Sequence, residues 1–116
     1  MEAAVWSFAV DQDDLVIPKG PVGTEENVRL ALETLIIPFG TRVENPEIYL
    51  REWRRMWRDF ESEYVLGTSS ATAKRVNSDQ VEIGDLYGQF ETCIMGVEEF
   101  ELALECMIYF LGHRRS

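Results

Sequence analysis

Large apolar side chains recur most regularly between residues 45 and 64, where their spacing predicts a helix. They are three or four residues apart, so a helix gathers them in one stripe about 100° wide. Asn45 is a favourable N-cap, and Gly67 lies where a C-terminal cap is common. We therefore expect the stripe to face the core and the arginines of this segment to face away from it. The stripe consists of Tyr49, Trp53, Met56, Trp57, Phe60 and Tyr64, and the arginines are Arg51, Arg54, Arg55 and Arg58.

Two short apolar runs near the start predict a strand and a candidate hairpin partner. Residues 4–10 are rich in β-forming side chains, and residues 15–17 follow after a polar turn and stop at Pro18. The next apolar residues, from 28 to 36, have helical spacing. Thr24 offers an N-cap hydroxyl for this helix, and Pro38 with Gly40 ends it.

The segment 68–95 fits two interpretations. Several of its apolar residues are spaced as in a helix, but Gly84 and Gly88 would each destabilise that helix by about 1 kcal/mol. The polar residues 77–80 have the composition of a turn between two strands. We therefore favour strands in this segment.

The last segment, residues 97–111, predicts an amphipathic helix. An apolar face that begins with Val97 and Phe100 lies apart from a face that carries Glu98, Glu101 and Glu105. Glu, Leu, Ala and Met dominate the segment, and these residues favour helix.

Together these elements predict a helix-dominated α+β fold. An N-terminal strand is followed by two antiparallel helices, a small antiparallel β region and the amphipathic C-terminal helix. An all-α bundle is the alternative, which requires a helix in residues 68–95. The length of 116 residues suits one compact domain over residues 1–116.

Charge narrows the range of partners. The chain has 21 acidic residues against 11 basic ones, a formal net charge of -10. We therefore expect it to bind neither nucleic acid nor an acidic membrane surface. The two cysteines, Cys93 and Cys106, are too few for a disulfide scaffold, so we expect the cytoplasm as its location.

Most catalytic signatures are missing from the sequence. It contains no glycine-rich phosphate loop and no nucleophile elbow, and His113 is its one histidine. We expect no catalytic residue, no metal site and no cofactor, and therefore a protein that is not an enzyme.

Paired carboxylates support a different interpretation. Glu82 with Asp85, and Glu98 with Glu101, are each three residues apart. This spacing is similar to that of the all-α nucleotide pyrophosphohydrolases, with their two motifs in reverse order. The resemblance implies a magnesium-dependent nucleotide hydrolase as the second alternative function.

The acidic residues are concentrated near the C-terminus. Between Asn77 and Gly112 there are eight acids and neither lysine nor arginine. Aligned like charges repel, and nothing near Glu98, Glu101 and Glu105 in the sequence is positive. Folding alone gives no reason to align them, so we expect the fold to persist when all three are replaced by lysine.

The leading functional hypothesis is a small acidic protein-binding domain that neutralises a basic protein, as bacterial immunity proteins and toxin inhibitors do. The first alternative is a self-associating structural or adaptor protein, a homodimer for example. In it the arginine stripe (Arg51, Arg54, Arg55 and Arg58) of one copy meets the acidic helix of another. The expected partner-binding residues are Glu98, Glu101, Glu105, Asp85 and Glu82.

Overall fold

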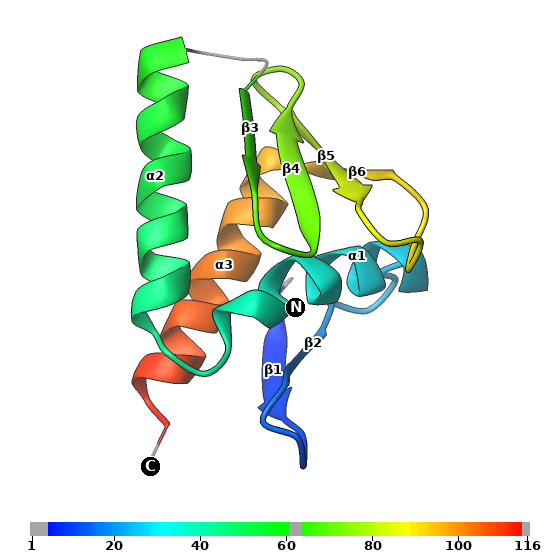
Figure 1. The fold of residues 1–116 in the computed structure, drawn as a ribbon, viewed down its shortest axis with the longest axis vertical. Coiled ribbons are helices and arrows are strands. Elements are labelled where there is room, and N and C mark those ends of the chain that lie inside the picture. Colours follow the sequence, from blue (N-terminus) through cyan, green and yellow to red (C-terminus); the bar gives the residue numbers. More distant parts are fainter. Residues whose placement is uncertain (1–4, 61–63, 115–116) are drawn as a thin grey trace.

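The computed structural model describes residues 5–60 and 64–114 of the chain (Figure 1). It contains three α-helices, a short 3-10 turn and six strands, and the helices hold more residues than the strands. In chain order these are β1 (Ser7–Val10), β2 (Val16–Lys19), α1 (Glu26–Ile36), the turn Ile37–Phe39, α2 (Glu44–Phe60), β3 (Tyr64–Gly67), β4 (Ala71–Arg75), β5 (Gln80–Asp85), β6 (Cys93–Gly96) and α3 (Val97–Gly112).

The strands form two antiparallel sheets. β1 and β2 make a hairpin, and β3 to β6 form a meander in which each strand pairs with the next one along the chain. Alternate residues of the meander point inward, as strand geometry requires. Val81 and Ile83 of β5 are fully buried, whereas Ile94 of β6 is half exposed on the outer face.

The helices cover the inner face of the meander and close the core. α1 packs against β4, β5 and β6, while α2 packs against α3 and β3. Trp53 of α2 is fully buried between Tyr64 and Phe100, with ring centroids 5.0 and 4.9 Å away. The core therefore joins α2, the meander and α3 through aromatic contacts.

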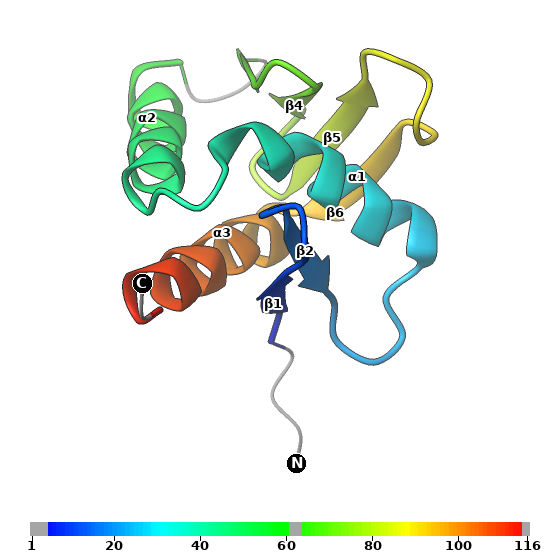
Figure 2. The same ribbon diagram turned by 60° about the horizontal axis from the view of Figure 1, so that its bottom comes forward.

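The α+β prediction is confirmed, and the all-α bundle is wrong because residues 71–96 form three strands. The turn after β4, the N-terminal hairpin and the C-terminal helix are also where the sequence predicts them. The predicted stop at Pro18 is wrong, because β2 continues through Pro18 to Lys19 opposite Ser7. The predicted antiparallel pair of helices is not formed. In Figures 1 and 2, α1 and α2 do not run alongside each other, and the helix that packs against α2 is α3.

The end of α2 differs most from the prediction. The helix stops at Phe60, which is 60% exposed, and Tyr64 and Gly67 belong to β3. Tyr64 is buried, as the helical spacing predicts, but it reaches the core from strand β3 and not from a helix. Met56 and Trp57 are only partly buried at the edge of the core.

Both predicted N-caps are corrected. Thr24 does not cap α1, because its hydroxyl donates to the carbonyl of Pro21 at 2.7 Å. Asn45 lies inside α2, and its side-chain amide donates to the carbonyl of Phe39 at 2.7 Å. Each polar side chain ties down the loop before its helix. Within the described ranges, every helix is too short or too polar to cross a bilayer.

Candidate functional site

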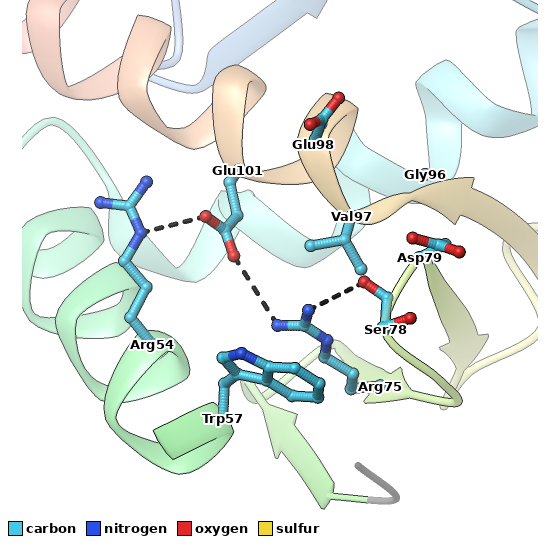
Figure 3. Close-up of a pocket in the computed structure, with 9 residues that line it drawn as sticks. All are labelled: Arg54, Trp57, Arg75, Ser78, Asp79, Gly96, Val97, Glu98 and Glu101. Atoms are coloured by element: carbon cyan, nitrogen blue, oxygen red, sulfur yellow. Dashed lines mark hydrogen bonds and ion pairs between the residues drawn. The ribbon is translucent and has the colours of Figure 1, made fainter. Parts of the chain in front are cut away.

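A cleft of about 540 Å³ opens at the N-terminal end of α3 (Figure 3). Its walls come from α2, from the end of β4 with the turn that follows it, and from the first residues of α3. This is where the meander, α2 and α3 converge. The side chains that shape it are Arg54, Trp57, Arg75, Asp79, Glu98 and Glu101.

Arg75, at the end of β4, forms the floor of the cleft and is only 5% exposed. Its guanidinium donates to the Tyr64 hydroxyl at 3.2 Å and to the carbonyls of Asn77 and Ser78 at 3.2 and 3.0 Å. It also stacks on Trp57, 3.8 Å from the ring centroid. Burial of this cation is thus compensated by three acceptors and an aromatic face.

Glu101 of α3 is the central acceptor of the cleft. One carboxylate oxygen accepts from the Trp53 indole N–H at 3.1 Å, and the other accepts from Arg54 at 3.0 Å. The Arg75 guanidinium lies 3.9 Å from the same carboxylate. Because its side chain is only 20% exposed, these contacts bind Glu101 firmly inside the protein.

Arg54 also reaches the next acid of α3, with a contact of 2.7 Å to Glu105. The hydrogen bond to Glu105 and then that to Glu101 raise the pKa of the Arg54 guanidinium. A single arginine therefore neutralises two of the three aligned glutamates. The expectation that folding gives no reason to align these acids is wrong, because α2 supplies the counter-charge from 47 residues away.

The rim of the cleft is acidic and differs from its floor. Asp79 and Glu98 are exposed, and neither forms an ion pair with any residue that the structure describes. The Val97 N–H donates to the Asp79 carbonyl at 2.8 Å, which fixes the β4–β5 turn against the start of α3. The cleft thus has two exposed carboxylates on its rim, with Arg75 between them and Trp57 (Figure 3).

The predicted partner-binding residues do not form one surface. Glu98 and Glu101 meet in the cleft, and Glu105 lies further along α3 and does not line the cleft. Glu82 and Asp85 lie on β5, where Glu82 is directly opposite Lys74 of β4. They do not line the cleft.

Asp85 has a local structural role. Its carboxylate accepts the backbone N–H groups of Tyr87 and Phe90 at 3.0 and 3.1 Å. Burial acts to raise the pKa of Asp85, but these backbone hydrogen bonds outweigh it and hold the pKa below its usual value. The ionised side chain therefore shapes the loop after β5.

The arginine stripe is also divided. Arg54 binds the acids of α3, and Arg55 pairs with Glu52 and Asp59 on its own helix. Arg51 and Arg58 line a separate shallow groove between α2 and α3. The arginine–glutamate contact that self-association would place between two copies is therefore made within one chain.

The carboxylate pairs lack the arrangement of a magnesium site. Glu82 and Asp85 lie on a strand, where residues three apart point to opposite faces. Glu101, in the other pair, is bound by two arginines and an indole. Among residues 5–60 and 64–114 there is no group of three or more His, Cys, Asp or Glu side chains placed to hold a metal ion.

Comparison with known proteins adds no relative: no family model, no curated protein and no solved structure matches the chain.

Most of the cleft was not predicted from the sequence. Asp79 was predicted only as a turn residue and as one of the eight acids near the C-terminus, and Arg75 gave no signal because its partners are main-chain carbonyls and distant aromatic residues. Glu98 and Glu101 were predicted as partner-binding residues, and Arg54 was predicted in a different role, as a self-association residue.

Proposed function

We propose that the protein is a non-enzymatic protein-binding domain whose cleft receives a lysine or arginine side chain of a basic partner. The observation that carries this proposal is the pair of exposed carboxylates, Asp79 and Glu98, on the rim of the cleft. A basic side chain can place its charge at the rim beside these two carboxylates, while Arg54 and Arg75 on the floor are already paired with Glu101. Inhibitors and immunity-type proteins that neutralise a basic protein are the class that fits.

The floor of the cleft supports the proposal by its rigidity. Arg75, Glu101 and Arg54 satisfy one another, so the rim acids are held on a fixed frame and need little ordering on binding. The net charge of -10 adds a long-range attraction for a basic protein and speeds encounter at low salt. Both cysteines are free thiols, as a reducing cytoplasm favours.

Self-association has less support than binding of a basic partner. Arg51 and Arg58 have no ion pair with a described residue, and they line the groove along α2. Arg54, in the middle of the stripe, is already bound to Glu101 and Glu105. Solution mass at low and high salt separates the two functions, because a salt-sensitive dimer favours self-association.

The test is affinity capture from an extract of the source organism with a charge-matched control. The variant Asp79→Asn/Glu98→Gln removes both rim carboxylates, and Asp13→Asn/Asp14→Asn removes the same charge from the exposed β1–β2 turn. We expect basic proteins captured by the natural chain to be retained by the control and reduced about tenfold by the rim variant. Equal capture by the two variants would show that the cleft is not the docking site.

A captured partner then allows a kinetic check. We expect the rim variant to associate more slowly than the control at low salt, and the difference to shrink as salt screens the charges. An association rate that is the same for both variants at every salt concentration would contradict the proposed role of Asp79 and Glu98.

A further inference from the structure

A second pocket, of about 460 Å³, lies at the other end of α3, against the N-terminal hairpin. β1 packs against α3, and its Phe8 contacts Phe110 near the C-terminal end of this helix. The pocket walls are mainly aromatic. Phe8 and Phe110 contribute rings with centroids 6.1 Å apart, and Tyr109 lies beside them with the His113 ring stacked on it at 4.0 Å. Its volume lies within the range typical of small-ligand sites.

Trp6, which lines the pocket, carries a buried donor without a partner. Trp6 is only 3% exposed, and its indole N–H is the one buried side-chain polar group without a hydrogen-bond partner among the described residues. Such a group destabilises a folded protein by about 1–3 kcal/mol unless it finds an acceptor. The Trp6 N–H therefore calls for an acceptor that residues 5–60 and 64–114 do not supply.

The charge around this pocket is opposite to that of the protein as a whole. None of the residues that line it is acidic, although the net charge of the chain is -10. Arg114 lies at its rim, 6.0 Å from the Phe110 ring, and forms no ion pair with a described acid. His113 donates from Nδ1 to the Tyr109 carbonyl at 2.8 Å. An anion is thus the expected charge class.

We propose that this pocket binds a small monocarboxylic acid with an apolar body. The body packs among Phe8, Tyr109 and Phe110, and the carboxylate supplies the counter-charge for Arg114. The Trp6 N–H is covered in this structure, so on binding the indole ring has to turn before it can donate to the carboxylate as well. The site is separate from the cleft at the N-terminal end of α3 and takes a ligand of opposite charge. Its test is therefore independent of the test of the proposed protein-binding function.

The test follows the Trp6 indole N–H resonance during titration with octanoate, 1-octanol and octylammonium. Trp6→Phe identifies that resonance among the three indole signals by deleting it. We expect a saturable shift with octanoate, a weaker response to octanol and none to octylammonium. Non-specific attraction cannot explain binding of octanoate, because the net charge of the protein repels anions.

Matched variants locate the carboxylate. Arg114→Gln should weaken octanoate binding about fivefold, while Arg42→Gln, the same charge change on an exposed turn, should leave it unchanged. Trp6→Phe, followed by calorimetry, should also weaken it about fivefold by removing the donor. If Trp6→Phe fails to fold, the arginine pair still decides the matter.

Three results would overturn the proposal. The first is the absence of any saturable shift with octanoate. The second is an equal response to octanol and octanoate that Arg114→Gln does not alter, because the pocket would then be merely apolar. The third is a shift that appears when the protein is concentrated without a probe, because a second copy would then cover the pocket.

Discussion

The two ends of α3 differ in whether the polar groups packed there have partners. At the N-terminal end, Glu101 and Arg75 are surrounded by partners from α2 and the meander. At the C-terminal end, Trp6 is buried with its N–H unsatisfied, and Arg114 has no described counter-charge. A satisfied network contributes to stability, whereas an unsatisfied buried donor reduces stability until it finds an acceptor. Substitutions at the first end should thus affect unfolding, and those at the second should affect binding.

The largest effect should come from Trp53→Ala at the N-terminal end. Trp53 is fully buried, contacts Tyr64 and Phe100 and donates to Glu101, so its loss should cost about 3–5 kcal/mol of unfolding free energy in urea titration. Trp57→Ala, which truncates a partly buried indole, is the control and should cost clearly less. Equal losses would mean that the two indoles are equally buried.

Glu101→Lys should have the next largest effect. The change removes the acceptor of the Trp53 N–H and places a third cation beside Arg54 and Arg75, so we expect a loss of about 2–3 kcal/mol. Glu98→Lys makes the same charge change at the exposed rim and should stay within about 0.5 kcal/mol. The expectation from sequence was that Glu98, Glu101 and Glu105 all tolerate reversal, and we now expect this only of Glu98, which forms no ion pair with a described residue. Similar losses for both variants would contradict the network around Glu101.

Alkaline pH should weaken the N-terminal end further. Burial raises the pKa of the Tyr64 phenol above its ordinary value of 10.0, and the neighbouring Arg75 only partly offsets this. The phenol is neutral in both states below that value, so its contribution is complete there and is lost as the pH rises through the folded-state pKa. Urea titrations between about pH 9 and 11 should show a steeper fall for the natural chain than for Tyr64→Phe. Parallel curves would remove Tyr64 as the cause.

The smallest effect on stability should come from Arg114→Gln at the C-terminal end. Arg114 is exposed and has no described ion pair, so unfolding free energy should change by less than about 0.5 kcal/mol. The same variant is expected to weaken octanoate binding, so binding and stability would separate at this end. A large loss of stability would show that Arg114 stabilises the C-terminal end of α3 as Glu101 and Arg75 stabilise its N-terminal end.

Local patterns predicted the elements well where one pattern dominated. The glycines and the polar residues 77–80 correctly favoured strands over helix, and the alternation of Val81 and Ile83 with polar neighbours gives a sheet with one buried face. The end of α2 failed because Tyr64 is buried in either interpretation, so its spacing from Phe60 matched a helix by coincidence.

The candidate site was only half predictable, because its geometry depends on contacts between distant segments. The concentration of acids was visible, but Arg54 is 47 residues from Glu101, and charge counting along the chain cannot pair them. Arg75 is held by two carbonyls of the turn that follows it, and no residue type signals such acceptors. The sequence thus predicted how many acidic residues this region carries, but not which arginines neutralise them in the folded protein.

The contact between β1 and α3 has a consequence for how the protein is made on the ribosome. Phe8 of β1 and Phe110 of α3, which pack side by side, are about 100 residues apart in the chain. At ordinary elongation rates β1 must wait on the order of 10 s for this partner helix. Until then only α1 can cover the hairpin, through β2, so a nascent chain that ends before α3 should leave Phe8 accessible to solvent.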